Sequence, residues 1–525
     1  MVWRNWIAGL TLLIWLCASQ AQATGRNWTA RWTDAEVDAL GYALAEAWTH
    51  GLDPSAYPHP DALRALPYGE SRDERARAVW FALAEDLAFG VVDPRALDPD
   101  WTAPIRDVDL LTVYAEAREG AGIYESLEAL APSHPDYQAL RAELVRRMAL
   151  QDAPIRVPPG EGALSLGDAG PRVDALRARL RQLGLLSGET APGAPFDARL
   201  ESAVIRFQTR HNLAADGEAG ASTLSELNAG DARRINPIRG HLGRWRWLPS
   251  ELGARHIRVN IADYGLEAWE NGEVVRTHEV MIGRRYSRTP IFSEDMSIIE
   301  INPYWLTPTS LGSRWLRSFR TNPAYALSQG YRLVDLDTGA RTNPYEADWA
   351  NRRYRVIQVP GPNNAMGRVK FLFPNVHNVY IHDTPHRELF ANAQRDDSSG
   401  CVRVQNPEDL AIWILAGEGW SAQEVVRAFD SGQTRRIRLR NVVPVHILYF
   451  TAVSDELGRI RFIHDVYDRD AALVAALSDP LLYIPPEQRQ AEADEEVEGE
   501  PESELEAGPG TEPENEPEPG AVPSP

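Results

Sequence analysis

Apolar residues recur every three or four positions in the first part of the chain. The clearest stretches with this spacing are 33–48, 72–89 and 135–150. Thr33 or Asp34 stands where a side chain that caps a helix is expected, and Gly51 follows the end of the first stretch. Because this spacing gathers apolar side chains on one face of a helix, we expect residues 27–153 to form a helical domain.

A second helical unit follows the proline- and glycine-rich linker at 154–162. It holds three short amphipathic segments that are separated by glycine turns. Such segments can bury only a small common core, so we expect a compact three-helix module at 163–230.

From Arg255 onward the pattern changes, because polar and apolar residues alternate as they do in strands. The predicted strands are 256–261, 266–275 with a hairpin turn at Asn271-Gly272, 277–282, 298–308, 436–439 and 443–450. Residues 309–370 are polar and rich in arginine, and we expect them to form an insertion that covers the active site. The domain at 255–465 is therefore predicted to be mainly β, which makes the chain a multidomain α+β protein.

A thiol and an imidazole stand out in this β-rich region. An apolar run with β-branched residues ends at His382, so the imidazole is expected at the end of a strand. The turn residues Ser398, Ser399 and Gly400 place Cys401 where a loop enters a strand or a helix. Backbone N–H groups at such a junction can converge on an oxyanion. A cysteine beside a histidine is the arrangement that nucleophilic acyl transfer needs, because the imidazole can take the thiol proton.

The N-terminus changes the interpretation of Cys401. A positive residue, the apolar run at 6–16 and the small residues around 21–23 predict a cleavable export signal over 1–23. The apolar run is shorter than the ~20 residues that a membrane span needs. The other cysteine, Cys17, lies within this signal. An exported protein that keeps a single unpaired thiol exposes it to oxidation, so we expect Cys401 to be functional rather than a small core residue.

Negative charge is concentrated at the C-terminal end. Residues 487–525 hold fourteen Asp or Glu and one Arg, which accounts for −13 of the net charge of −21. This stretch is rich in glutamate and proline and poor in aromatic residues, so we expect a disordered acidic tail. No region is strongly basic and no known reader motif occurs, so nucleic acid is not an expected partner.

These residues resemble two known families. His382, followed after a polar loop by the run from Ser398 to Arg403 (Ser-Ser-Gly-Cys-Val-Arg), resembles the motif of the YkuD-type L,D-transpeptidases. The module at 163–230 resembles the peptidoglycan-binding type 1 domain in its Gly-Asp, Phe-Asp, Phe-Gln, Asp-Gly and Thr-Leu positions. The order of helical scaffold, wall-binding module and catalytic domain with a large insertion resembles the YcbB-like periplasmic branch. One departure is Ser399, where many family members have His or Asn.

The resemblance implies a reaction and a set of site residues. Cys401 would be the nucleophile and His382 the base, and the backbone of Gly400 and Cys401 would form the oxyanion hole. The residues expected to line the substrate groove or to orient the imidazole are Arg403, Tyr380, Trp305, Ser399 and Asp383. The implied reaction takes a tetrapeptide stem, releases D-Ala through a thioester and joins the acyl group to a neighbouring stem in a 3→3 cross-link. Carbapenems would acylate the same thiol.

The resemblance also implies a periplasmic enzyme without cofactor or metal. Its expected partners are peptidoglycan stem peptides, as donor and as acceptor, together with proteins of cell-wall synthesis. A membrane contact is expected only if the signal at 1–23 is retained.

Three other functions stay open at this point. Three histidines close to Asp383 suggest a zinc hydrolase: His377, His382 and His386. However, no His-Glu-x-x-His pattern occurs, and a proline interrupts the helical spacing of the last two. The chain could be a wall-binding scaffold without catalysis, against which the presence of both Cys401 and His382 counts. It could also be an L,D-carboxypeptidase, in which water replaces the acceptor amine.

Overall fold

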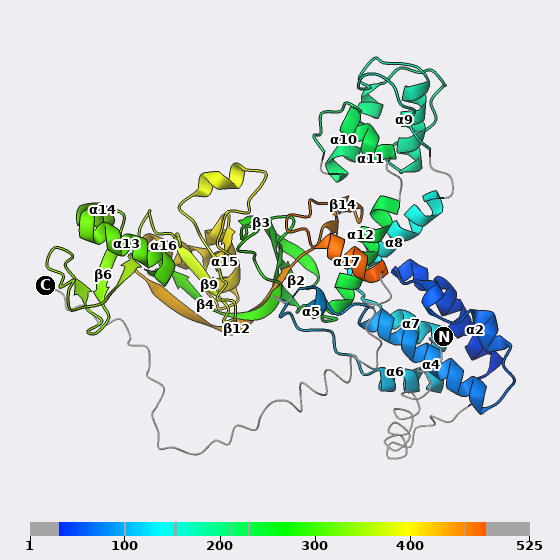
Figure 1. Cartoon of the computed structure of the whole chain (residues 1–525), viewed down its shortest axis with the longest axis horizontal. Coiled ribbons are helices and arrows are strands. Elements are labelled where there is room, and N and C mark those ends of the chain that lie inside the picture. The colour runs from blue at the N-terminus through cyan, green and yellow to red at the C-terminus, as the bar shows by residue number, and fades with distance from the viewer. Residues whose placement is uncertain are drawn as a thin grey trace.

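The computed structural model describes residues 31–98, 101–151, 155–211, 213–228, 232–455 and 457–478. The predicted signal at 1–23 and the predicted acidic tail at 487–525 lie outside the described residues. A helical N-terminal region, a three-helix module and a β-rich C-terminal region follow one another (Figure 1), which confirms the predicted α+β class. Within the described ranges, no helix has the length and apolar character that crossing a membrane requires.

The N-terminal region is a set of helices around an aromatic core. Its main helices are α2 (Asp34–Glu46), α4 (Glu70–Ala88), α6 (Leu110–Glu116) and α7 (Ile123–Leu130). The next helix, α8 (Pro135–Gln151), packs instead into the core that includes the barrel. Thr33 caps α2 as expected, because its hydroxyl accepts a hydrogen bond from the Glu36 N–H while the Glu36 carboxylate accepts one from the Thr33 N–H. The rings of Trp80 and Tyr114 meet edge to face in the core, with their centres 5.0 Å apart.

The three-helix module consists of α9 (Pro171–Gln182), α10 (Ala198–Arg210) and α11 (Ala221–Asn228). Phe196 and Phe207 lie in its small core. The buried side chain of Gln208 ties down the turn before α11. Its amide nitrogen donates to the Glu218 carbonyl oxygen at 2.9 Å, and its amide oxygen accepts from the Gly217 N–H at 2.9 Å. The Phe-Gln and Asp-Gly pairs of the sequence therefore meet in one packed turn.

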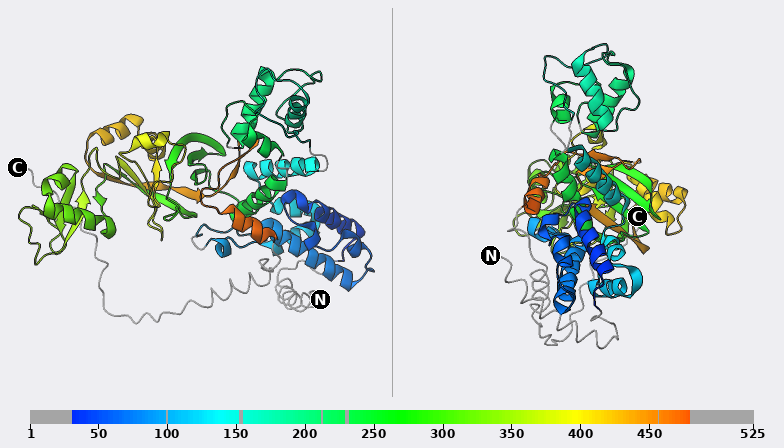
Figure 2. Two further views of the ribbon diagram at one scale, coloured as in Figure 1. Left: turned by 45° about the horizontal axis from the view of Figure 1, so that its top comes forward. Right: turned by 90° about the vertical axis from the view of Figure 1, so that its right-hand side faces the viewer.

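This module projects from the rest of the molecule in both views of Figure 2. It meets the C-terminal region where α10 lies beside β14 (Ile460–Phe462). The ring of Phe462 lies 5.9 Å from that of His211, and the Arg234 guanidinium lies 4.4 Å from the same phenyl ring. The contact is small, so each part keeps a core of its own.

The C-terminal region is built on a closed barrel. Its strands are β1 (Arg255–Asn260), β2 (Gly265–Glu270), β3 (Glu273–Met281), β4 (Phe292–Ile301), β9 (Val369–Leu372), β10 (Ile381–His382), β11 (Val402–Val404) and β12 (Arg435–Leu448). Around the barrel they follow the order β1-β12-β4-β9-β10-β11-β3-β2. Most neighbours are antiparallel, but β1 runs parallel to β12, and β10 runs parallel to β11. Ile257, Ile299 and Phe371 are fully buried in the core of the barrel.

The strands differ in three places from the predicted ones. The predicted strand at 298–308 covers the end of β4, which already begins at Phe292, and a separate short strand at Trp305–Leu306. The predicted strand at 277–282 is the second half of β3, which begins directly after the Asn271-Gly272 turn. The two strands predicted within 436–450 are one, β12, whose pairing is irregular between Arg438 and Val443. An irregularity of this kind bends a strand without ending it, so it looks like a break in the alternation of the sequence.

An insertion connects β4 to β9. It consists of β5 (Trp305–Leu306), α13 (Thr309–Thr321), α14 (Pro323–Ser328), β6 (Tyr331–Asp335), β7 (Arg341–Thr342) and β8 (Tyr354–Gln358). Its strands form a separate sheet in the order β5-β8-β6-β7, with a small core that includes Phe319 and Val356. The insertion lies at the end of the barrel that is far from the helical region (Figure 1). Ile301 and Val369, where the chain leaves and re-enters the barrel, pair with each other.

Helix α12 (Ala232–Trp247) joins the module to the barrel and is not predicted by the hydrophobic pattern. It contains Pro237, and it lies against α8 and against α17 (Asp470–Ser478). Arg244 of α12 donates to the Asp470 carboxylate at 2.6 Å. Proline inside a helix removes one backbone hydrogen bond, which explains why a sequence with this residue does not look helical.

We expect Gln208→Ala to destabilise the module by about 1–3 kcal/mol, because it leaves buried backbone groups without partners. Hydrogen exchange followed by mass spectrometry should then show faster exchange in peptides that cover 213–228. Ser202→Ala, on an exposed position of the same helix, is the matched control and should leave this exchange unchanged. Equal exchange in Gln208→Ala and the unmodified chain would contradict the role given to this side chain.

Candidate active site

The parallel pairing of β10 with β11 brings the predicted imidazole and thiol to one place. Ile381 lies opposite Val402, and His382 lies opposite Arg403. Cys401 directly precedes β11, so it stands where a loop enters a strand. Because side chains alternate along a strand, His382, Arg403 and Cys401 share the face opposite to the buried Ile381 and Val402. The imidazole and the thiol thus lie on the same face of these strands, where the sulfur of Cys401 is 3.9 Å from the Asn378 carbonyl oxygen.

His382 is held by its own backbone and is only 3% exposed. Its Nδ1 lies 2.5 Å from the Asp383 carbonyl oxygen, so Nδ1 carries the proton and Nε2 is left as an acceptor. Burial, together with the charges of Arg403 and Lys370, lowers the pKa of His382 to about 3. The imidazole is therefore neutral near neutral pH and is able to accept a proton.

Cys401 is half-buried and is the one free cysteine of the described residues. Burial raises the pKa of the Cys401 thiol, and interactions with the backbone and the side chain of Tyr380 offset only part of that rise. The charges of Arg403 and Lys370 also act to lower this pKa. The resting thiol is therefore protonated near neutral pH. In a pair made of a neutral thiol and a neutral imidazole, the proton moves as the sulfur attacks.

The nucleophile loop, which we define as residues 398–401, is held by its own hydrogen bonds. The Ser398 hydroxyl accepts from the Gly400 N–H at 3.0 Å and donates to the Cys401 carbonyl oxygen at 2.6 Å. Gly400 has a φ of 115°, which residues with a side chain rarely adopt. The sequence suggests that the N–H groups of both Gly400 and Cys401 face the oxyanion. In the structure the Gly400 N–H is already occupied by Ser398, which makes the Cys401 N–H the donor of interest.

Two further predicted residues lie beside the thiol and the imidazole. The ring centre of Tyr380 lies 5.6 Å from that of His382, and the Tyr380 hydroxyl donates to the sulfur of Met366 at 3.4 Å. Arg403 is partly buried, and its Nε has no partner among the described residues. Burial lowers the pKa of Arg403, and the positive charge of Arg284 contributes to this shift. This side of the site is therefore positively charged.

The other three predicted residues have different surroundings. Trp305 is partly buried and packs against the core of the insertion. Ser399 is exposed. The carboxylate of Asp383 is buried and accepts hydrogen bonds from the Arg368 N–H at 2.8 Å and the Thr384 N–H at 2.7 Å. Asp383 therefore orients the imidazole through its backbone carbonyl rather than through its carboxylate.

Three residues at the site are not singled out by the sequence. The Thr289 hydroxyl donates to the Gly400 carbonyl oxygen at 2.9 Å, and the Tyr467 hydroxyl donates to the Gly283 carbonyl oxygen at 2.5 Å. Lys370 lies opposite His382 in the pairing of β9 with β10. Lys370 is the only lysine of the chain, so composition offers a signal for it. Thr289 and Tyr467 offer none, because both bind backbone atoms that lie far away in the sequence.

The structure gives no support to the zinc alternative. His377 pairs with the Thr102 hydroxyl at 2.8 Å, and His386 lies on the surface, 3.4 Å from the Glu388 carboxylate. In the part of the chain that the structure describes, no group of three His, Cys, Asp or Glu side chains is placed to hold a metal ion.

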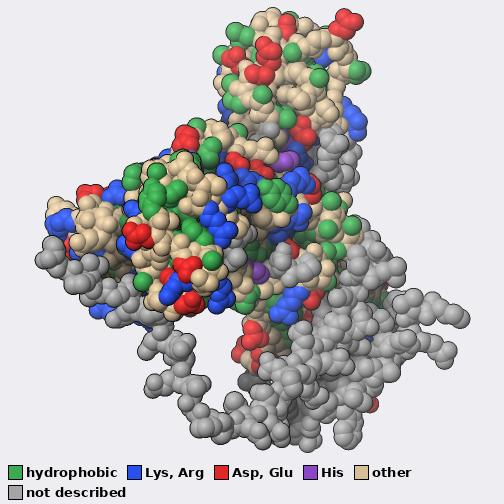
Figure 3. Space-filling model, turned by 60° about the vertical axis from the view of Figure 1, so that its left-hand side comes forward, with side chains coloured by type: hydrophobic (Ala, Val, Ile, Leu, Met, Phe, Trp, Pro, Cys, Tyr) green, Lys and Arg blue, Asp and Glu red, His purple; other side chains and the backbone are tan. Residues whose placement is uncertain are grey.

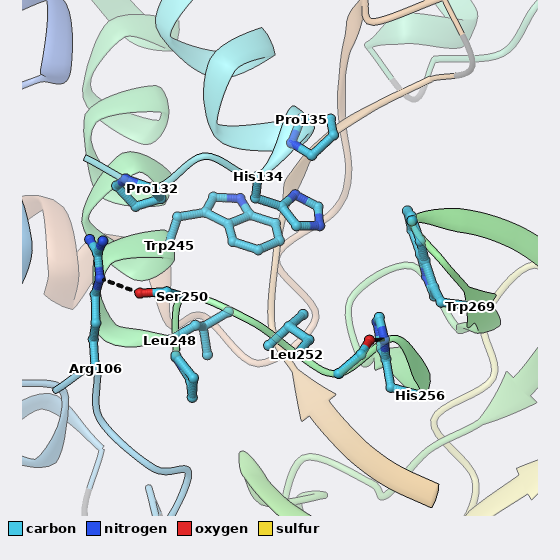
Figure 4. A pocket seen from close by; sticks show the side chains of 13 residues that line it. Arg106, Pro132, His134, Pro135, Trp245, Leu248, Ser250, Leu252, His256 and Trp269 are labelled. Atoms are coloured by element: carbon cyan, nitrogen blue, oxygen red, sulfur yellow. Dashed lines mark hydrogen bonds between the residues drawn. The ribbon is translucent and has the colours of Figure 1, made fainter. Parts of the chain in front are cut away.

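The surface near the insertion and a cavity at the other end of the barrel differ in the residues that they present. Seen from the side that carries the insertion, Lys and Arg side chains gather next to hydrophobic ones (Figure 3). The cavity, of about 160 Å³, lies where the helical region, the end of α12 and the barrel meet, with His134, Trp245 and Trp269 among its walls (Figure 4). None of the predicted site residues is among the described residues that line it. It is therefore separate from the candidate active site.

Comparison with family models matches three parts of the chain. Residues 254–428 match the model described as "L,D-transpeptidase catalytic domain". This part of the chain is an L,D-transpeptidase domain. Residues 24–144 match "Scaffold domain", and residues 169–227 match "Putative peptidoglycan binding domain". The L,D-transpeptidase domain contains His382 and Cys401, and the predicted resemblance to this family and to the wall-binding domain is confirmed.

One curated relative of the L,D-transpeptidase domain comes from Haemophilus influenzae and is named "Putative L,D-transpeptidase". It is 32% identical over 219 residues, which cover 41% of this chain and 44% of the relative. The chain thus spans less than half the length of this relative.

Two solved structures of L,D-transpeptidases are also similar, with low sequence identity and low TM-scores. One, from Stackebrandtia nassauensis, is 12% identical with a TM-score of 0.19, and the match covers 56% of this chain and 97% of that chain. Another, an L,D-transpeptidase in complex with imipenem, is 16% identical with a TM-score of 0.18, and the match covers 37% of this chain and 59% of that chain. Likeness at this level supports no argument about the chain.

We expect alkylation of Cys401 by iodoacetamide to speed up steadily with rising pH, with an apparent pKa above the ordinary thiol value of about 8.5. The reason is that burial raises the pKa of the thiol while the neutral imidazole provides no positive charge to stabilise the thiolate. The measurement is the rate of mass gain of the intact chain across a pH series, with Cys401→Ala as the blank. A rate that stays flat through neutral pH would reveal a preformed thiolate–imidazolium pair and contradict this description.

Proposed function

We propose that the chain is a peptidoglycan L,D-transpeptidase in which Cys401 is the nucleophile and His382 is the base. The observation that carries this proposal is the parallel pairing of β10 and β11, which places the imidazole and the thiol on one face of the barrel. The unprotonated Nε2 of a neutral imidazole is the group that a protonated thiol needs beside it.

The first half of the proposed reaction forms a thioester. As the Cys401 sulfur attacks the amide carbonyl before the terminal D-Ala of a tetrapeptide stem, its proton passes to Nε2 of His382. The Cys401 N–H donates to the oxyanion that develops on the carbonyl oxygen. The C–N bond then breaks, the leaving nitrogen takes the proton from His382, and D-Ala departs.

The second half resolves the thioester. The side-chain amine of diaminopimelate in a neighbouring stem attacks the thioester carbonyl, and His382 takes a proton from that amine. The C–S bond breaks, and the sulfur of Cys401 receives the proton. The product is a 3→3 cross-link, and both Cys401 and His382 return to their starting states. Carbapenems would enter the same first half, with their strained lactam amide in place of the stem peptide.

The charges around the thiol fit a substrate with carboxylates. Stem peptides carry several carboxylate groups, and Arg403 and Lys370 provide cations beside the thiol and the imidazole. Tyr380 stays in the proposed groove because it approaches both His382 and the thiol. For Trp305 and Ser399 the role in substrate binding remains a proposal from the family motif.

The remaining parts of the chain fit a wall enzyme that holds two strands at once. A wall-binding module and a helical scaffold would keep the chain on its polymeric substrate, which raises the local concentration of stem peptides at Cys401. This role implies action in the periplasm, in contact with the cell wall and with proteins that build it.

Turnover of a disaccharide tetrapeptide, followed by liquid chromatography and mass spectrometry, tests the proposal. The expected products are free D-Ala and a cross-linked dimer. We expect no turnover by Cys401→Ala and a loss on the order of 10²–10⁴-fold in His382→Ala, the range for a lost general base. The matched control is His386→Ala, which removes an exposed histidine four residues away and should leave turnover unchanged.

Other outcomes separate the alternatives. Release of D-Ala with tripeptide but without dimer would replace the transpeptidase with an L,D-carboxypeptidase. Turnover that survives in Cys401→Ala would contradict the proposed nucleophile. An unmodified chain that binds the muropeptide without any turnover would favour a wall-binding scaffold.

A further inference from the structure

We propose that Tyr467 is a positioning residue that sets the direction of the Cys401 N–H and hence the geometry of the oxyanion hole. The inference rests on the proposed function. Tyr467 lies outside the part of the chain that matches the L,D-transpeptidase model, which ends at residue 428. It is fully buried, and its hydroxyl reaches the loop that supports the nucleophile.

The hydroxyl of Tyr467 closes the support loop, which we define as residues 283–289. It donates to the Gly283 carbonyl oxygen at 2.5 Å and accepts from the Thr289 N–H at 3.1 Å. The Thr289 hydroxyl in turn accepts from the Gly283 N–H at 2.9 Å. The two ends of the support loop are thus joined through one tyrosine oxygen and one threonine oxygen. A Cβ on Gly283 would lie 2.1 Å from the Ser287 carbonyl oxygen, so the loop closes in this way only around glycine.

The support loop then holds the nucleophile loop. The Thr289 hydroxyl donates to the Gly400 carbonyl oxygen at 2.9 Å. The Ser398 carbonyl oxygen accepts from the Arg284 N–H at 3.1 Å, and the Ser398 N–H donates to the Ile282 carbonyl oxygen at 2.8 Å. Two of these contacts come from the support loop and the third comes from Ile282, the residue before it, so the backbone of the nucleophile loop is fixed against this one segment.

The contact with the Gly400 carbonyl is the one that matters for the reaction. The Gly400 C=O and the Cys401 N–H belong to the same peptide unit, which is planar and trans. When Thr289 fixes the direction of the C=O, it also fixes the N–H on the opposite side of that unit. Tyr467 holds the Thr289 backbone, so it acts on the oxyanion donor through Thr289.

Tyr467 itself is anchored from its own side. Its N–H donates to the Tyr449 hydroxyl at 2.9 Å, and the Tyr449 hydroxyl donates to the Asp465 carboxylate. That carboxylate also accepts from the N–H groups of Arg469 and Asp470, at 2.9 and 2.8 Å, at the start of α17. The tyrosine is therefore held in place by a fixed turn, as a positioning residue must be.

A positioning role and a merely structural role predict different results. Acylation by a carbapenem passes through an oxyanion, so it needs a correctly placed Cys401 N–H. Alkylation by iodoacetamide displaces iodide from carbon and forms no oxyanion, so it needs only an accessible and reactive thiol. A loss of positioning slows the first reaction alone, whereas general damage to the site slows both reactions.

The experiment compares the two rates in the full chain by intact-mass spectrometry at one pH, with imipenem and iodoacetamide as probes. For Tyr467→Phe we expect acylation to slow about 10-fold, a partial loss of the 10²–10³-fold effect that a whole oxyanion donor supplies. Alkylation should stay within about twofold, because the thiol and His382 are untouched. Thr289→Val should likewise slow acylation and leave alkylation unchanged. Thr289→Ser, which keeps the hydroxyl, should be acylated at the rate of the unmodified chain.

Tyr57→Phe is the matched control, because it removes a buried tyrosine hydroxyl from the helical region, where it donates to Asp86 at 2.6 Å. Both of its rates should equal those of the unmodified chain. If Tyr467→Phe does not fold, Thr289→Val carries the test alone. Unchanged acylation in these variants, or an equal fall in both rates, would overturn the positioning role. An unmodified chain that imipenem does not acylate would instead overturn the proposed function.

Discussion

The parallel pairing of β10 with β11 is the constraint on which the candidate site depends. In this pairing His382 of β10 lies opposite Arg403 of β11, and Cys401 directly precedes β11. The barrel makes this pairing rigid, because Ile381 and Val402 are fully buried on its inner face. One face of the same two strands therefore provides the core, and the other provides the chemistry. A shift of one residue in this register would exchange the two faces and bury the thiol.

Burial decides the protonation states of the pair. An imidazole with a pKa of about 3 and a thiol whose pKa is raised are both neutral near neutral pH. Such a pair differs from a preformed thiolate–imidazolium, because it is inert until a substrate carbonyl accepts the sulfur. This also explains why the backbone around Cys401 is held by so many contacts. When the thiolate is not stabilised beforehand, stabilisation of the oxyanion supplies a larger share of the rate enhancement. The rate then depends more strongly on the direction of the Cys401 N–H group.

Much of this could be predicted from the sequence. The capping box at Thr33, the turn at Asn271-Gly272 and the strand that ends at His382 are local signals, and the structure has all three. Helix α12 was not predicted because Pro237 interrupts its helical pattern. Strand β12 was predicted as two strands because its pairing is irregular. The occupation of the Gly400 N–H by Ser398 and the contacts of Thr289 and Tyr467 depend on how the loops fold together. Contacts between backbone atoms and distant side chains leave no pattern in a single sequence.

The proposed base is a neutral imidazole, protonated at Nδ1, on the same face of the barrel as the thiol of Cys401. Nitrogen-15 spectroscopy of a histidine-labelled chain tests it directly, with the His382 signals assigned by their loss in His382→Gln. We expect one protonated Nδ1 and one bare Nε2, with no titration between about pH 5 and 8, where an ordinary histidine titrates. A His382 ring that titrates near the ordinary value of about 6.5, or one that carries its proton on Nε2, would contradict it.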